Sequence, residues 1–375
     1  MAARVVDLAV VGGGPVGLAA ALRAVAAGLD AVVVEPRARP AGGGAATGLE
    51  VVDKACGEGL LPGALAEVLA LGADPPGAPL TGITYVQDGD GAAAGRAVSH
   101  DFTAGAGRGV RRTALHAALA ERAAAAGVPL LAGRVVELVQ DGARVQLDVA
   151  VPGAAGVEPL VARWVVGADG LHSGVRRAAG LEAPARGGAV RFGVRRHAAL
   201  VPWSSHVEVH WGRGVEGYVT PVGPREVGVA VLGPRGTTFT EGLEQLPALA
   251  HRLGGAPWTT AARGAGPLRQ RVRAVASGRV LLAGDAAGYV DALTGEGLRV
   301  GLASARLAVE AVTGERARRV ADAYAAAWAR ETRAHRALTA GLLAAAELRP
   351  LRAALVPVAA AAPGVFGAVV DRLAR

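Results

Sequence analysis

The first 35 residues follow a pattern that few folds accommodate. Residues 5–11 form an almost wholly apolar run, which predicts a parallel strand buried on both faces. A glycine-rich turn, 12–17, separates this strand from a helical stretch at 18–27. A second strand, 30–34, is apolar after Asp30 and ends at an acidic residue, Glu35. The order of strand, turn, helix, strand and acid predicts a dinucleotide-binding βαβ unit.

Each glycine of the turn has a distinct expected role. Gly12 permits the tight turn, Gly14 lets the backbone approach a pyrophosphate, and Gly17 lets the helix pack closely on the strand. Glu35 is placed to accept both hydrogen bonds from an adenosine ribose, which fits FAD or NAD but not NADP; Arg37 follows as a further cofactor contact. Because a chain with 55 glycines produces such a spacing by chance, the prediction depends on the whole βαβ pattern.

Two later segments favour FAD over NAD. Residues 164–170 read as a strand that ends in Asp169-Gly170, and residues 279–285 as a strand that ends in Gly284-Asp285. Carboxylates at the ends of strands in a doubly wound sheet suit a ligand with many hydroxyl groups. The ribityl chain of a flavin has that character, and a nicotinamide dinucleotide lacks it.

Together these motifs resemble those of the FAD flavoproteins of the para-hydroxybenzoate hydroxylase fold. Residues 112–119 also resemble that family's arginine-led helix, which implies that Arg112 lies near FAD. The resemblance covers roughly residues 1–335. It implies that Asp285 holds the ribityl chain and that Asp169 and Gly170 lie near the phosphate and ribityl region.

The expected fold class is α/β, with a Rossmann-like FAD-binding domain of the glutathione-reductase type, an antiparallel β substrate domain and a C-terminal helical segment. The doubly wound FAD domain is expected to be discontinuous, and the boundaries follow the motifs. We expect it at residues 1–85, 105–180 and 270–335, with the β-sheet substrate domain at 86–104 and 181–269 and the helical segment at 336–375.

The loop after Gly284-Asp285 indicates the branch of the family. Its residues Gly295, Gly297 and Leu298 begin a helix whose amide groups are expected to face the flavin pyrimidine edge. Aromatic hydroxylases usually have His where this chain has Gly288, and the Gly-Glu-Gly sequence is similar to the geranylgeranyl reductase group. That group also has a Lys-x-Cys-Gly segment near the flavin, which resembles residues 54–57.

Flavin-dependent halogenases are the nearest rival in sequence, since their Gly-Glu loop resembles residues 57–62. Their chemistry needs a lysine and a Trp-x-Trp-x-Ile-Pro motif. The matching segment here, 216–221, has neither tryptophan, and Lys54 is the one lysine in the chain. Halogenation is therefore a minor alternative.

The leading hypothesis is hydride exchange between flavin N5 and a carbon-carbon double bond of an apolar isoprenoid, polyene or polyketide-like metabolite. Cys56 and Glu58 are the candidate proton donors or acceptors, and Tyr218 is a substrate contact with an ionisable hydroxyl. Lys54 is expected to raise the thiolate fraction of Cys56 if the two side chains are close.

Other reactions stay open. The same fold supports an NAD(P)H- and O2-dependent monooxygenase that hydroxylates or epoxidises a small molecule, and a non-redox FAD-bound cyclase, isomerase or prenyl-binding protein. NAD(P)H is the expected transient electron donor in the redox cases.

His206, Glu208 and His210 alternate along one predicted strand and therefore share a face. A tetrahedral metal site needs a third or fourth ligand, and the sequence offers no further cluster, so we expect no metal. A solvated or substrate-facing polar row is the favoured interpretation.

The net charge of +8 comes from scattered arginines in a chain with 3% aromatic residues, which argues against nucleic acid. Such a surface would suit an acidic carrier protein, a phosphorylated substrate or an anionic membrane. A lone cysteine and the lack of a signal-like start predict a cytoplasmic protein, with peripheral membrane contact left open.

The Ala/Leu-rich end, interrupted by Pro350, Pro357 and Pro363, is expected to form helices packed on the flavin domain, where they would line an apolar cavity.

Overall fold

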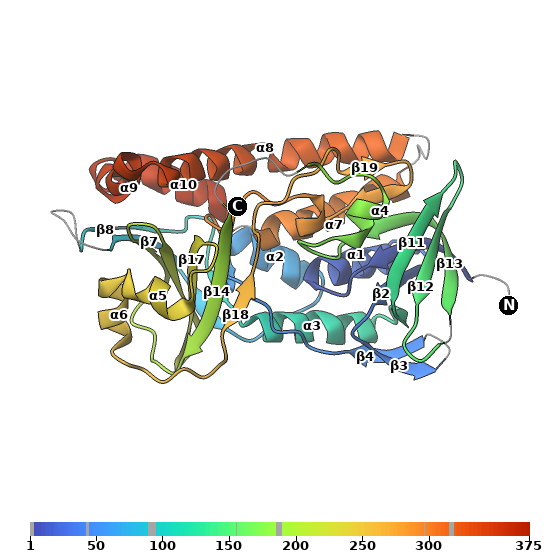
Figure 1. The fold of residues 1–375 in the computed structure, drawn as a ribbon, viewed down its shortest axis with the longest axis horizontal. Helices are drawn as coiled ribbons and strands as arrows, with labels where there is room; N and C mark the ends of the chain where they lie inside the picture. Colours follow the sequence, from blue (N-terminus) through green and yellow to red (C-terminus); the bar gives the residue numbers. More distant parts are fainter. Residues whose placement is uncertain are drawn as a thin grey trace.

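The computed structural model describes residues 4–42, 45–88, 95–154, 156–184, 190–295, 297–314 and 319–375. It has two large sheets at opposite ends of the molecule, with helices between and above them (Figure 1). The mixed α/β architecture confirms the predicted fold class.

The first sheet has ten strands and a parallel centre. Its spatial order is β11 (Arg134–Gln140), β12 (Val145–Ala150), β13 (Val157–Gly167), β1 (Arg4–Val11), β2 (Ala31–Glu35), β10 (Leu130–Ala132), β4 (Ala45–Leu49) and β3 (Ala38–Gly42), with β20 (Val280–Leu282) beside β13 and β19 (Ala276–Ser277) beside β20. Strands β20, β13, β1, β2 and β10 run parallel, so their carboxyl ends meet at one edge. In β1, residues Leu8–Val11 are buried, as a strand covered on both faces requires.

Helices cover this sheet in layers. The layers contain α1 (Pro15–Ala26), α2 (Pro62–Ala70), α3 (Arg112–Ala125), α4 (Gly174–Ala178), α7 (Gly297–Thr313) and α8 (Val320–Glu347). Helix α1 packs against α3 and α7, and α8 lies over α7 (Figure 1). The close approach of α1 to β1 requires glycine, because a Cβ on Gly17 would lie 1.8 Å from the Gly12 carbonyl oxygen. Gly12 itself has a φ of 110°.

The second sheet has seven strands. Its order is β18 (Arg263–Ala265), β14 (Arg191–Ala198), β17 (Glu226–Pro234), β16 (Glu216–Gly223), β15 (His206–Trp211), β7 (Gly82–Gln87) and β8 (Ala97–Asp101). It is antiparallel except for β7 and β15, which pair in parallel because no hairpin joins them. The boundary expected between residues 85 and 86 falls inside β7. Helices α5 (Phe239–Glu244) and α6 (Pro247–Leu253) lie beside this sheet, and a small third sheet joins β5 (Gly59–Leu60), β9 (Gly107–Gly109) and β6 (Ala78–Leu80).

The C-terminal helices differ from the expectation in their packing. Helix α8 runs across the expected boundary at residue 336, and α9 (Arg349–Ala361) and α10 (Pro363–Ala374) pack mainly on β7 and β8 of the second sheet, while α10 also contacts α2 of the flavin domain. Buried Val356, Phe366 and Val370 join Tyr85 and Trp211 in one apolar cluster there. The substrate sheet supplies an apolar surface that the helix-covered first sheet no longer has free.

The interpretation of the polar row on β15 is wrong for Glu208 and His210, whereas His206 is partly exposed. Glu208 and His210 are buried, because helix α6 and Asp88 cover that face. His210 bridges Asp88 and Glu208 at 3.0 and 3.2 Å, and Arg252 holds Glu208 with two hydrogen bonds. No group of metal-ligating residues is found in the part of the chain that the structure describes.

Candidate FAD and substrate site

A cavity of about 1000 Å³ lies between the two large sheets. It begins at the carboxyl ends of the parallel strands and reaches the inner face of the second sheet. Every site residue predicted from the sequence lines it, except Gly17. These residues are Gly12, Gly14, Glu35, Arg37, Cys56, Glu58, Arg112, Asp169, Gly170, Tyr218, Gly284, Asp285, Gly295, Gly297 and Leu298.

One end of the cavity is built for an anion. The N-terminus of α1 faces it at Gly14, and a Cβ on Gly14 would lie 3.8 Å from Nη2 of Arg112. Arg112 Nη1 is buried and has no hydrogen-bond partner in the structure, and burial lowers the pKa of this guanidinium. A buried cation without a partner beside a helix N-terminus fits the pyrophosphate of a dinucleotide.

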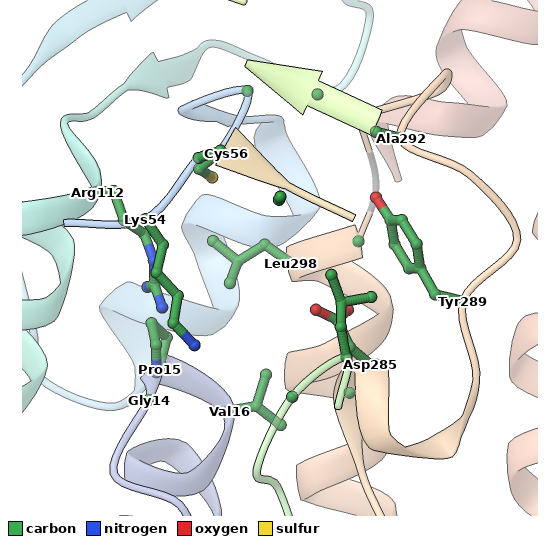
Figure 2. Close-up of a pocket in the computed structure, with 18 of the residues that line it drawn as sticks. Gly14, Pro15, Val16, Lys54, Cys56, Arg112, Asp285, Tyr289, Ala292 and Leu298 are labelled. Carbon is green, nitrogen blue, oxygen red and sulfur yellow. The ribbon is translucent and has the colours of Figure 1, made fainter. Parts of the chain in front are cut away.

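Lys54 lies beside Arg112, and its side chain points toward the start of α1 (Figure 2). Its Nζ lies 3.9 Å from the position that a Cβ on Gly170 would take. Loss of bulk water and the neighbouring Arg112 and Arg37 lower the pKa of Lys54, although the ammonium is open to the cavity. Two adjacent cations at this end strengthen its preference for a doubly charged group.

The strand-end acid of β2 is held in place by backbone groups. Glu35 accepts hydrogen bonds from the N–H of Gly13 at 2.7 Å and of Arg37 at 3.0 Å. His116 also anchors the glycine turn, since its Nε2 donates to the Gly13 carbonyl at 2.8 Å while its Nδ1 accepts from the N–H of Val52. Burial lowers the pKa of His116, which fits this neutral tautomer.

The two aspartates of the later motifs have different surroundings. Asp169 accepts hydrogen bonds from the Ser173 hydroxyl and from the N–H groups of Gly174 and Val175, so it organises the start of α4. The Asp285 carboxylate faces the cavity (Figure 2), and burial raises its pKa while Lys54 and Arg112 lower it. Of the two, Asp285 is the group available to ligand hydroxyls.

Arg176 ties these motifs together. Its guanidinium is 1% exposed and donates to the carbonyls of Leu171, Asp285 and Ala286. It stands inside the Asp-Gly segment seen in the sequence, but nothing there showed that it would reach the Gly-Asp motif.

The loop that carries Lys54 and Cys56 is fixed by the second sheet. Arg195 of β14 pairs with Asp53 and donates to the Lys54 carbonyl at 3.0 Å. Thr220 of β16 donates to the Gly57 carbonyl at 2.8 Å. The sequence contained no signal for Arg195, because it lies 142 residues from Asp53.

Glu58 sits at the centre of this attachment. Its Oε2 is 2.7 Å from Nε2 of His197, and its Oε1 accepts from the N–H of Arg112 at 2.8 Å. Glu58 is buried and has a φ of 61°, a conformation that a non-glycine residue adopts at a cost. This geometry makes Glu58 a link between the substrate sheet and the first turn of α3.

Cys56 is half-buried at the middle of the cavity, and its Sγ accepts a hydrogen bond from the N–H of Glu58 at 3.4 Å. Burial raises the pKa of the Cys56 thiol, and Arg112, not Lys54, is the main group opposing it. The condition under which Lys54 would raise the thiolate fraction of Cys56 is not met, because the Lys54 side chain points away from Cys56 (Figure 2).

Two tyrosines lie on the other side of the cavity. The Tyr218 hydroxyl donates to the Leu293 carbonyl at 2.9 Å, and burial raises its pKa well above the usual value. Tyr289, which the sequence reasoning did not single out, lies across the cavity from Cys56 (Figure 2). Burial and the nearby Asp285 carboxylate raise the pKa of Tyr289, so its phenol is neutral.

The far end of the cavity is apolar. It is lined by side chains from the second sheet, the adjoining loop and the last helix, among them Ile83, Tyr85, Phe192, Val207, Val209, Leu232, Leu268 and Leu373. Val207 and Val209 alternate with the polar residues of β15 and so face the cavity. The cavity thus joins an anion-binding end to a hydrophobic one.

A glycine turn at a helix N-terminus, strand-end acids and a buried unpartnered arginine define the class: an FAD-dependent flavoprotein whose cofactor cavity continues into an apolar end. The chain belongs to the FAD binding domain family, whose model matches residues 5–339. It is an FAD-dependent oxidoreductase.

The curated relatives share one name. The menaquinone reductase of Mycolicibacterium smegmatis is 32% identical over 327 residues, which cover 82% of this chain and 76% of the relative. The menaquinone reductase of Mycobacterium tuberculosis is 30% identical over 333 residues, with 81% and 76% covered.

Solved structures share the fold at lower identity. A geranylgeranyl bacteriochlorophyll reductase-like protein from Thermoplasma acidophilum has a TM-score of 0.75 at 18% identity and covers 100% of this chain and 92% of its own. The flavin-dependent halogenase CmlS has a TM-score of 0.73 at 20% identity, with 92% and 65% covered. At these identities the likeness concerns the fold alone.

Proposed function

We propose that the chain hydrogenates a carbon-carbon double bond in an apolar substrate that bears an isoprenoid, polyene or polyketide-like chain. The observation that carries this proposal is the continuous cavity, with cations and Asp285 at one end and aliphatic and aromatic side chains at the other. Support comes from the relatives named menaquinone reductase, because menaquinone is a quinone with an isoprenoid tail.

FAD, when bound, supplies a hydride from flavin N5 to one carbon of the double bond. The residues that would hold it are Arg112 and Lys54 at the pyrophosphate, Glu35 at the adenosine ribose and Asp285 at the ribityl hydroxyls. The apolar lining orients the substrate and excludes water from the reacting carbons.

The second carbon needs a proton, and Cys56 is the proposed donor. Its raised pKa keeps the thiol protonated at neutral pH, and its Sγ opens onto the cavity. After transfer, the thiolate recovers a proton from solvent. We assign positioning roles to Glu58 and Tyr218, because the carboxylate fixes the Cys56 loop and the hydroxyl holds the loop at Leu293. The neutral phenol of Tyr289 is a second proton source facing the same space.

Reduction of the cofactor is assigned to NAD(P)H as a transient donor. The test begins with FAD-loaded protein that is photoreduced without oxygen and mixed with a geranylgeranyl-bearing lipid that contains no quinone ring. The proposal predicts flavin reoxidation by the substrate alone and a product two hydrogens heavier. A separate anaerobic mixture with NADH or NADPH measures flavin bleaching and identifies the donor.

The same experiment separates the alternatives. A strict requirement for oxygen, with a product one oxygen heavier, would assign the chain to the monooxygenases. A changed substrate without any flavin reoxidation would assign it to the isomerases or cyclases. Either outcome removes the hydrogenation proposal.

A further inference from the structure

The last two helices form an apolar corner. Helices α9 and α10 meet at an angle of 102°, and residues 353–370 contain no charged or hydrogen-bonding side chain. We call residues 348–370 the C-terminal corner. An uninterrupted apolar segment at the molecular surface needs an explanation, because such patches usually mark contact sites.

The C-terminal corner has an inner and an outer face. Val356, Phe366 and Val370 are buried against the second sheet. Large side chains on the outer face are exposed: Leu348 by 55%, Leu351 by 48%, Val358 by 62% and Val365 by 67%. The packed inner face argues against a membrane-spanning segment, and no single described helix is long and apolar enough to cross a bilayer.

The C-terminal corner is firmly held to the rest of the chain. Arg352 donates to the carbonyls of Gly212 at 2.6 Å and Val215 at 2.7 Å and pairs with Glu216. In α10, Asp371 accepts from the N–H of Thr103 at 3.0 Å and lies 3.2 Å from Nε2 of His100. The exposed apolar face is therefore part of a fixed shape.

The charged residues near the C-terminal corner indicate the kind of partner that it binds. Within residues 348–370 there is no acid, and exposed arginines stand at both ends of the segment: Arg349 at its start, and Arg372 and Arg375 after it. Glu347 precedes the segment, and Asp371 is engaged by Thr103 and His100. Exposed apolar side chains with arginines at both ends of the segment match the boundary between acyl chains and anionic headgroups.

We propose that the C-terminal corner is a docking surface for an anionic lipid bilayer. The outer face of α9 and α10 enters the interface while Arg349, Arg372 and Arg375 meet the lipid phosphates. Leu373 of α10 lines the apolar end of the cavity, so the docked helix also borders the cavity. Docking concerns the surface alone and does not depend on the proposed reaction.

The test measures sedimentation of the FAD-loaded full chain with vesicles of equal parts phosphatidylglycerol and phosphatidylcholine, without substrate. We expect binding that weakens at least about fivefold on pure phosphatidylcholine or at high salt. The double variant Val358→Asp with Val365→Asp is expected to bind at least about tenfold more weakly. A matched control is Val136→Asp with Val139→Asp, because these valines are 55% and 57% exposed on β11 at the opposite end of the molecule (Figure 1).

The control should bind within about twofold of the parent chain. No binding to anionic vesicles, or an equal loss in both double variants, overturns the proposal. Light scattering measures the oligomeric state of the chain. If the chain is a dimer that only the Val358 and Val365 double variant dissociates, the C-terminal corner binds a second copy of the chain, and the docking proposal is overturned. If that variant does not retain its FAD spectrum, the variant Leu351→Trp provides the test. Its tryptophan fluorescence should shift to shorter wavelength when anionic vesicles are added. An unshifted emission rejects docking.

Discussion

Buried arginines near the substrate side of the cavity have carboxylate partners, whereas two cations that line its cofactor side have none in the described part of the chain. On the substrate side each buried arginine meets a carboxylate: Arg191 pairs with Glu216 and Asp291, and Arg352 with Glu216. On the cofactor side, Arg112 and Lys54 have no ion-pair partner among the residues that the structure describes. The arginine-carboxylate pairs contribute to the stability of the fold. A cation without a carboxylate partner marks a place where a bound ligand supplies the negative charge.

Breaking a completed pair should have the largest effect. Arg191→Leu would leave Glu216 and Asp291 buried without their cation, so we expect the free energy of unfolding to fall by about 3–5 kcal/mol. The FAD dissociation constant of the folded fraction should change less than about threefold. Urea unfolding and a fluorescence titration with FAD measure the two quantities.

The exposed pair of Arg163 with Asp7 supplies the control for this prediction. Arg163→Leu should cost less than about 1 kcal/mol, since exposed ion pairs contribute little. An Arg191 variant that keeps its stability but loses FAD would reverse the comparison between the two sides.

Removing a cation that has no ion-pair partner among the described residues should weaken FAD binding without lowering the stability of the chain. Arg112→Ala should raise the FAD dissociation constant about 10- to 100-fold, because it deletes a charge-assisted contact to the pyrophosphate. The stability of the FAD-free chain should be unchanged or higher, since a buried cation without a partner is removed. Calorimetric titration and thermal unfolding of the FAD-free protein measure these effects.

The neighbouring Arg111 offers a matched control, because it points to Glu226 on the substrate side at 3.5 Å and does not line the cavity. Arg111→Ala should leave FAD affinity within about twofold. Equal losses in the two variants would mean that α3 as a whole, and not the Arg112 guanidinium, controls binding.

Cys56 lies between the two sides of the cavity. Its replacement should have the smallest of these effects, and the effect is on turnover. Cys56→Ser should keep FAD bound and slow turnover at least about tenfold. Since the protonated thiol is the active form, activity should persist above the usual thiol pKa and fall only as pH rises through the raised value. The serine variant should lack this alkaline decline, and unchanged turnover would remove Cys56 from the mechanism.

The sequence predicted most of the cofactor side because strand order determines it. Parallel strands bring their carboxyl ends to one edge, so Glu35, Asp169 and Asp285 were expected together, and all three line the cavity. The sequence could not distinguish the engaged Asp169 from the open Asp285. That difference depends on local hydrogen bonds of Ser173 and Gly174, which a motif does not encode.

The substrate side was harder to predict because its contacts are distant in sequence. Glu58 and His197 are 139 residues apart, and no periodicity relates them. On β15 the alternation was correct but the choice of face was wrong, since α6 covers Glu208 and His210. Burial of a strand face is decided by what packs on it, and that information lies elsewhere in the chain.

The position of Lys54 has a practical consequence. It is the one lysine in the chain, and its ammonium opens onto the cavity with a lowered pKa, so it is the side-chain amine best suited to acylating reagents near neutral pH. A cofactor seated against α1 would cover it. Amine labelling followed by mass spectrometry can therefore report the occupancy of this cavity without any knowledge of the substrate.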